Sequence, residues 1–166
     1  MPNDNRELIY RAEIQALAFA AAVAIKTQNS DAFTSVSRQL LNLAVDIDVP
    51  SAIRDVASEI HDSLSLQMTD AGLNAMNATI SQLAGAADQL QAAINSAKAG
   101  KTDLFFPAVA DAASRALTTF GSLKTAVDKV QQDLRTASNT QLGDIPQKLQ
   151  GLLADLDNLG KVFKSA

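Results

Sequence analysis

The sequence predicts an all-α protein: an up-down bundle of about five long antiparallel helical rods with left-handed heptad packing. Three observations lead to this fold class. The helix-breaking residues are scarce, with 7 Gly and 4 Pro in 166 residues. Hydrophobic residues make up 47% of the chain and recur with alternating three- and four-residue spacing. No stretch alternates polar and apolar residues in the way strands do. We expect one domain over residues 1–166.

The clearest helical pattern covers Phe106 to Leu134. Its apolar side chains predict one unbroken helix with a continuous a/d seam. A loop is expected over Ser138 to Gly143, followed by a last helix that opens with Asp144. The two seams consist of Phe106, Val109, Ala113, Ala116, Phe120, Leu123, Val127, Val130 and Leu134, and of Ile145, Leu149, Leu152, Leu156, Leu159 and Phe163.

The first helix is expected to begin near Asn5, because Asp4 and Glu7 fit a capping box. Its second half, Ala16–Ile25, is apolar all round, and such a helix must be enclosed by protein or lipid. The apolar run Ile14–Ile25 is shorter than the roughly 20 residues that cross a bilayer. We therefore expect a buried bundle helix, with a membrane-inserting segment as the alternative. The candidate membrane residues are Leu17, Phe19, Val23 and Ile25.

The second rod is expected to start with Ser30 as its N-cap and to break at Pro50. The sequence leaves open whether the pieces before and after Pro50 form one kinked helix. Their inward-facing residues are predicted to be Phe33, Val36, Leu40, Leu43 and Ile47 in the first piece, and Ile53, Val56, Ile60 and Leu64 in the second.

A long helix is expected from Thr69 to Ala97, about 40 Å in length. Its only charge between Ala71 and Ala97 is Asp88, and small residues, including Gly85, line one face. A helix so poor in charge is predicted to be covered on two sides, either within the bundle or by another chain. The candidate partner interface consists of Asn74, Asn77, Ser81, Asp88, Gln91 and Asn95.

Composition argues against several functions. The net charge of −4 disfavours nucleic-acid binding. The absence of Cys excludes disulfides, thiolate catalysis and Cys-ligated metals. His61 is the only His, and the carboxylates near it (Asp55, Glu59 and Asp62) share a face that is predicted to point to water. No phosphate-binding loop is present, since Gly100-Lys101-Thr102 lacks the earlier Gly. We expect no enzyme activity, no cofactor and no metal.

Two functions from different classes remain. The first is a non-enzymatic module that binds another protein or a second copy of itself, because heptad seams are readily shared between chains. The alternative is a membrane-active bundle that opens and inserts the segment around Ala16–Ile25. We expect a cytoplasmic protein, or one exported without a cleavable signal peptide, because the N-terminus is polar and mixed in charge. The composition is similar to that of many bacterial surface, secretion and chemosensory bundles, but it carries no motif.

Overall fold

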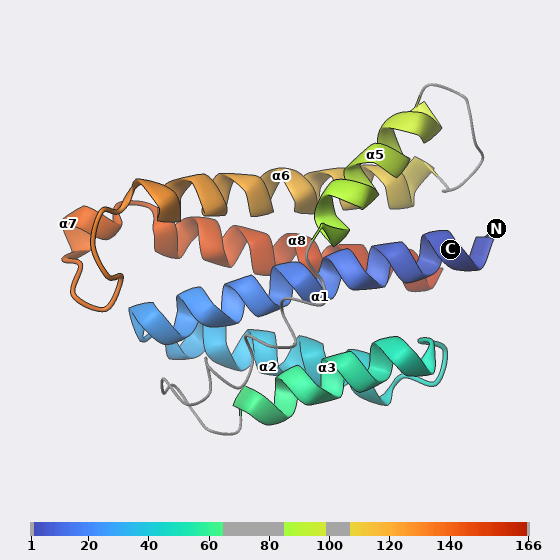
Figure 1. Cartoon of the computed structure of the whole chain (residues 1–166), viewed down its shortest axis with the longest axis horizontal. Helices are drawn as coiled ribbons and strands as arrows, with labels where there is room; N and C mark the ends of the chain where they lie inside the picture. The colour runs from blue at the N-terminus through green and yellow to red at the C-terminus, as the bar shows by residue number, and fades with distance from the viewer. Residues whose placement is uncertain (1, 65–84, 99–106, 166) are drawn as a thin grey trace.

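The computed structural model describes residues 2–64, 85–98 and 107–165 (Figure 1). Over these ranges the chain forms seven helices and no strand, which confirms the all-α prediction there. The helices are α1 (Pro2–Thr27), α2 (Ser30–Val45), α3 (Ser51–Leu64), α5 (Ala86–Lys98), α6 (Pro107–Lys129), α7 (Asn139–Leu142) and α8 (Ile145–Ser165).

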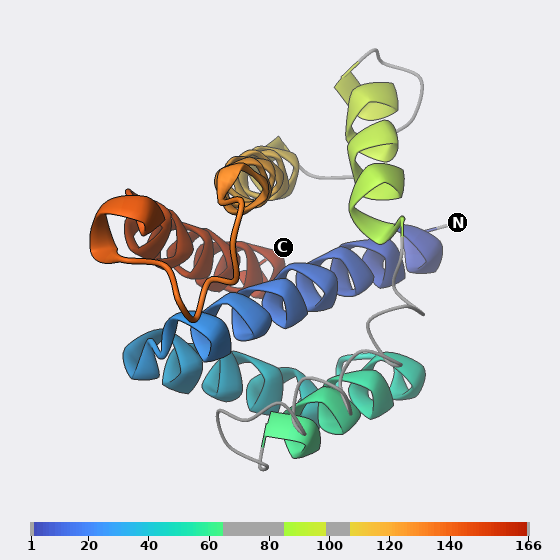
Figure 2. The same cartoon turned by 60° about the vertical axis from the view of Figure 1, so that its left-hand side comes forward.

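Helix α1 lies at the centre of the molecule. It contacts α2, α3, α5 and α8, and both views place it between the α2–α3 pair and the α6–α8 pair (Figures 1 and 2). Leu17, Ala20 and Ala24 are fully buried on it. The apolar character of this helix on all sides therefore matches its position, because neighbours cover it from several directions.

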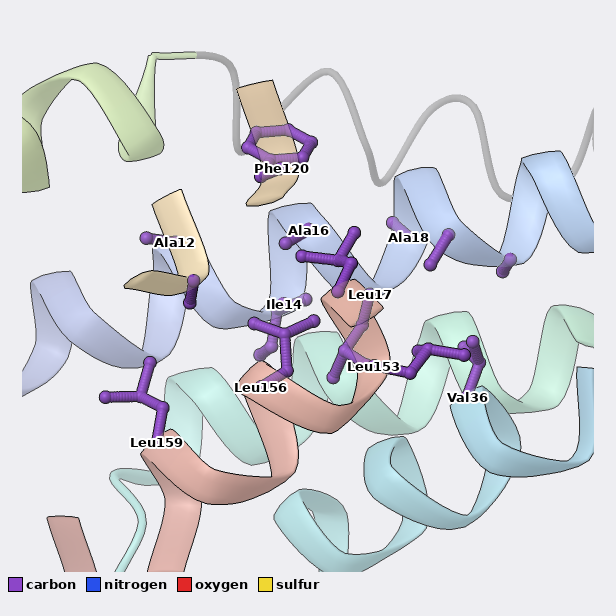
Figure 3. Packing of buried hydrophobic residues seen from close by; sticks show 14 of the residues in the cluster. Ala12, Ile14, Ala16, Leu17, Ala18, Val36, Phe120, Leu153, Leu156 and Leu159 are labelled. Carbon is purple, nitrogen blue, oxygen red and sulfur yellow. The ribbon is translucent and has the colours of Figure 1, made fainter. Parts of the chain in front are cut away.

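The buried side chains form one hydrophobic cluster, to which α1, α2, α3, α5, α6 and α8 all contribute. Figure 3 shows Leu156 of α8 beside Ile14 and Leu17 of α1. Two edge-to-face aromatic pairs join α1 to its neighbours, with ring centroids 5.0 Å apart in one and 5.6 Å in the other. These pairs are Tyr10 with Phe163 and Phe19 with Phe120. The predicted α8 seam, from Ile145 to Phe163, is buried at all six positions.

The link between α1 and α2 corrects one predicted cap. Gln28 adopts a left-handed conformation (φ 56°), and the amides of Gln28 and Asn29 donate to the carbonyls of Ile25 and Ala24. This Schellman-type ending leaves Asn29 in an extended conformation. Its Oδ1 then accepts a hydrogen bond of 3.0 Å from the amide of Ala32. The N-cap is therefore Asn29, and Ser30, which the sequence favoured, is the first helical residue.

The predicted break at Pro50 separates two helices, because α2 ends at Val45 and α3 begins at Ser51. The intervening turn is held by Asp46, whose side chain accepts from the Asp48 amide at 3.0 Å and whose carbonyl accepts from the Val49 amide at 3.1 Å. Val49 is buried, whereas Ile47 is 84% exposed. The assignment of Ile47 to the inner seam was wrong, because the turn rotates it away from the core.

The seam predicted to run unbroken to Leu134 ends earlier. Helix α6 stops at Lys129, and Asp133 then forms a turn by accepting hydrogen bonds from the amides of Arg135 and Thr136. Such local side-chain bonds compete with helix. Leu134 is still buried, but from a loop. Phe106 lies outside the described residues.

Two further predictions differ from the structure. The loop expected over Ser138 to Gly143 contains one helical turn, α7, which begins with a capping box between Ser138 and Gln141. The helix expected to run from Thr69 to Ala97 is not continuous, because α5 begins only after Gly85, whose φ of +84° is outside the right-handed helical region. Thr69 itself lies outside the described residues.

Candidate functional site

Glu13 is an acidic side chain near the middle of α1, and it is only 6% exposed. No hydrogen bond joins its carboxyl group to the parts of the chain that the structure describes. Gly160 of α8 faces it, and a Cβ added at Gly160 would lie 3.6 Å from Oε1 of Glu13. Glu13 was not among the residues predicted from the sequence. The signal was available, because Glu13 is the only charged residue between Arg11 and Lys26.

Glu13 borders a groove of about 200 Å³ between α1, the C-terminal part of α2 and the C-terminal part of α8, called here the α1/α2/α8 groove. The wall is formed by apolar and aromatic side chains, the rim by polar and charged ones. The wall contains Tyr10, Leu43, Leu156 and Phe163, and the rim contains Gln39, Asn42, Asp46, Asp157, Lys161 and Lys164.

The rim charges are paired with each other. Nζ of Lys161 lies 3.1 Å from Oδ2 of Asp157 on α8. Nζ of Lys164 lies 3.2 Å from Oδ2 of Asp46, so this pair joins α8 to the end of α2. Together with Glu13, the groove is lined by three carboxyl groups and by the two ammonium groups of Lys161 and Lys164. The groove has one acidic group more than it has basic groups.

Two carboxyl groups of the groove have shifted pKa values. Burial raises the pKa of Glu13 to about 8, and the nearby charge of Asp157 adds to the effect. The hydrogen bond from the backbone amide of Asp48 lowers the pKa of Asp46, and Lys164 acts in the same direction. At neutral pH, Glu13 is therefore mostly protonated, while Asp46 is ionised.

Gln39 closes one end of the groove. It is 5% exposed, and its Nε2 donates to the carbonyl of Leu153 on α8 at 3.1 Å. Beyond Gln39 lies a second groove of about 460 Å³ between α2 and α8, with mostly polar side chains such as Ser35, Arg38 and Gln150. The hydrogen bond of Gln39 fixes the spacing of the two helices between these grooves.

A second surface feature is an exposed apolar patch at the end of α2. It consists of Leu41, Val45 and Ile47, which are 45%, 66% and 84% exposed and are the large hydrophobic residues exposed within the described ranges. We call it the α2 patch. Leu41 and Val45 lie on the face of α2 opposite the buried Val36 and Leu40, and Ile47 lies in the turn that follows α2.

The candidate membrane residues all belong to the packed centre. Leu17, Val23 and Ile25 are buried, and Phe19 is partly buried against the core. The stretch Glu7–Thr27 is the one part of the described chain that is long and apolar enough to cross a membrane by length and composition, and 72% of its most apolar window is buried. It is longer than the run Ile14–Ile25 that the sequence analysis considered.

The candidate partner interface is only partly described, since Asn74, Asn77 and Ser81 lie outside the described residues. The structure brings the other three together on one side of α5. Asp88 and Asn95 are exposed, and Gln91 donates to Oδ1 of Asn95 at 3.0 Å. The opposite side of α5 carries the buried Leu90 and Ile94.

No group of three His, Asp or Glu side chains is placed to hold a metal ion in the part of the chain that the structure describes. His61 of α3 is partly exposed, with Nδ1 3.6 Å from Oδ1 of the neighbouring Asp62. No protein-family model, curated protein or solved structure matches this chain.

Proposed function

We propose that this protein is a non-enzymatic helical module that associates with a second copy of itself through the outer face of α2. The α2 patch carries this proposal. Three exposed large hydrophobic residues within seven positions of the sequence (Leu41, Val45 and Ile47) are typical of an interaction site. Burial of such residues in a second surface is favourable by roughly 25 cal/mol per Å² of apolar area.

The most exposed residue of the patch is presented by an ordered turn. Asp46 accepts the amide of Asp48 and pairs with Lys164 of α8. Arg54 of α3 donates from Nε to the carbonyl of Val49 at 3.0 Å. Because three helices hold this turn, Ile47 loses little freedom on binding, and preorganised side chains make the best anchors of an interface.

The outer face of α2 also has the pattern of a two-fold contact. Its exposed residues Thr34, Arg38, Leu41 and Val45 follow spacings of four, three and four residues, which is the seam of a coiled coil. Arg38 lies at one end of the patch and Asp48 at the other, and both are exposed. In an antiparallel two-fold pair, each Arg38 would face the Asp48 of the other copy.

The α2 patch is small, which favours a weak dimer over an obligate one.

The polar face of α5 (Asp88, Gln91 and Asn95) remains a predicted contact for another protein, but it offers no large apolar anchor. The up-down arrangement of five rods with left-handed heptad packing is part of the same proposal, because it leaves outer helix faces such as that of α2 available for a coiled-coil contact.

Sedimentation equilibrium over about 10 µM to 1 mM protein tests the dimer. We expect the wild type to dimerise with a dissociation constant within that range, as small interfaces do. Ile47→Ser is expected to weaken the dimer at least tenfold, because it removes the main apolar anchor. The substitutions used here, at Ile47, Arg38 and Asp48, all change exposed residues. Circular dichroism should therefore show an unchanged fold for each variant.

A charge swap provides the matched control. Arg38→Asp and Asp48→Arg should each weaken the dimer, because each places like charges together, and the double variant should restore it. A wild type that stays monomeric at every concentration would exclude the proposal. A dimer that neither Ile47→Ser nor the charge changes affect would place the contact on another surface.

A second candidate is a membrane-active protein, and the length and hydropathy of Glu7–Thr27 are the observation that favours it. The raised pKa of Glu13 lowers the cost of moving this helix into lipid, because the neutral carboxyl group is easier to desolvate. This function predicts that the protein floats with liposomes of neutral or anionic lipid at pH 7 or pH 5. Protein that stays at the bottom of the gradient under all four conditions would exclude it.

A further inference from the structure

We propose that the α1/α2/α8 groove is a binding site for a small organic cation, namely a primary alkylammonium ion whose charged head contacts Glu13. This inference concerns a different surface from the α2 patch and does not depend on dimerisation. It starts from a buried carboxyl group that borders a groove and has no hydrogen-bond partner among the described residues.

The state of Glu13 points to a ligand. The carboxyl group of Glu13 has no protein partner, yet no side-chain oxygen or nitrogen of the described residues is both sealed from solvent and unpartnered. The carboxyl oxygens of Glu13 are therefore reachable from the groove. Glu13 is more than nine-tenths buried, yet its carboxyl group borders the groove, with Oε1 facing the side-chain-free position of Gly160. A donor placed in the groove could hydrogen-bond these oxygens directly.

The charges of the groove indicate that this donor is a cation. Asp157 and Asp46 are already paired with Lys161 and Lys164. Glu13 is the carboxyl group left over, and Asp157 lies close enough to repel its ionised form. When Glu13 is ionised, one added positive charge would balance the set, whereas an anion would add to the excess negative charge.

The size and the walls of the groove indicate the chemistry of the part of the ligand that is attached to the ammonium head. A volume of about 200 Å³ is below the range of drug-sized ligands. Tyr10 and Phe163 offer aromatic surface, which attracts both alkyl groups and ammonium ions. Leu43 and Leu156 complete an apolar wall. A short alkyl chain with one ammonium head fits this combination of surfaces.

Binding should release a proton. The groups that face Glu13 are Asp157 and Lys161 on α8, Tyr10 on α1, and the Asp46–Lys164 pair at the end of α2. On the opposite side, α5 and α6 present apolar residues such as Leu90 and Phe120. The ammonium ion binds the ionised carboxylate, so affinity should rise with pH up to about 8. The ligand itself stays charged, because amines of this type titrate near pH 10.

The test uses n-butylammonium chloride, with 1-butanol and sodium butyrate as matched neutral and anionic probes. Calorimetry at pH 8.5 is expected to give a dissociation constant of about 1 mM for butylammonium, in line with ligands of this size. The affinity at pH 6 should be more than tenfold weaker. Tyr10 is the only Tyr of a chain without Trp, so tyrosine fluorescence reports directly on the groove.

Two variants locate the site. Glu13→Gln keeps the shape and removes the charge, and it should abolish butylammonium binding. Gly160→Ala adds a methyl group at an ordinary contact distance from Oε1, and alanine favours helix, so the fold is kept while the affinity falls. No heat and no fluorescence change at pH 8.5 would overturn the proposal. Equal binding of 1-butanol, or unchanged binding by Glu13→Gln, would also overturn it.

Discussion

Glu13→Gln is expected to make the protein more stable than the wild type at pH 9 and to change its stability little at pH 5. The pKa of Glu13 is about 8 in the folded state and near 4.5 in the unfolded chain. In the unfolded chain Glu13 releases its proton at a lower pH than in the folded protein. The contribution of this carboxyl group to the free energy of unfolding is therefore fully present below pH 4.5 and is lost as the pH rises to about 8. The loss at pH 9 is on the order of 5 kcal/mol, and a neutral amide does not undergo it.

Urea unfolding at pH 5, 7 and 9 measures this effect. The wild type should lose stability steadily across the series, and the slope should be largely absent in Glu13→Gln. Glu59→Gln, which changes an exposed carboxylate of α3, is the matched control and should follow the wild type. A wild type whose free energy of unfolding is constant from pH 5 to 9 would show that Glu13 is not buried in the folded protein.

Ala20→Glu is expected to unfold the protein or to destabilise it by about 4 kcal/mol or more. Ala20 has no exposed surface, and it lies on the helix that contacts α2, α3, α5 and α8. A carboxylate there would be buried without a partner, and the four additional heavy atoms of Glu would overpack a site that holds only a methyl group.

Thermal unfolding followed by circular dichroism measures the result, with Ala154→Glu as the control. Ala154 is exposed on α8, so the same substitution there should change stability by less than about 0.5 kcal/mol. An unchanged melting temperature for Ala20→Glu would contradict the central position of α1. It would also favour the membrane candidate, which needs this helix to leave its neighbours easily.

The buried helix faces could be predicted from the sequence because periodicity records which side of a helix meets the core. Leu149, Leu152 and Leu156 were assigned to the inner face of the last helix in this way, and all three are buried. The same argument recognised that the apolar half of α1 must be enclosed. These features depend on patterns of many residues, so a single exception does not change them.

The helix ends could not be predicted as well, because single hydrogen bonds decide them. Asn29 and Ser30 are both good N-caps, and only the left-handed Gln28 before them selects Asn29. Asp133 could equally have stayed in a longer helix, but its side chain bonds the amide of Arg135 instead. At the end of α6 the apolar spacing continues through Val130 to Leu134, so it does not indicate where the helix stops.

The candidate site was missed for a different reason. Glu13 is visible in the sequence as a lone charge on an apolar helix, and this signal could have been used. The groove is not visible, because it depends on how α1 and α8 are aligned, with Gly160 opposite Glu13. The alignment of two helices so far apart in the sequence is a tertiary property that no local pattern encodes.

The central position of α1 has a consequence for biosynthesis. Helix α1 is synthesised before every helix that covers it: α2 and α3 follow it directly, and α5 and α8 come later. At a synthesis rate of about 5–20 residues per second, roughly 10 to 30 s pass between the synthesis of α1 and that of α8. Until α5 and α8 have been made, the apolar helix α1 lacks the part of its cover that these two helices provide. We therefore expect the nascent chain to bind chaperones or a lipid surface more readily than the folded protein does.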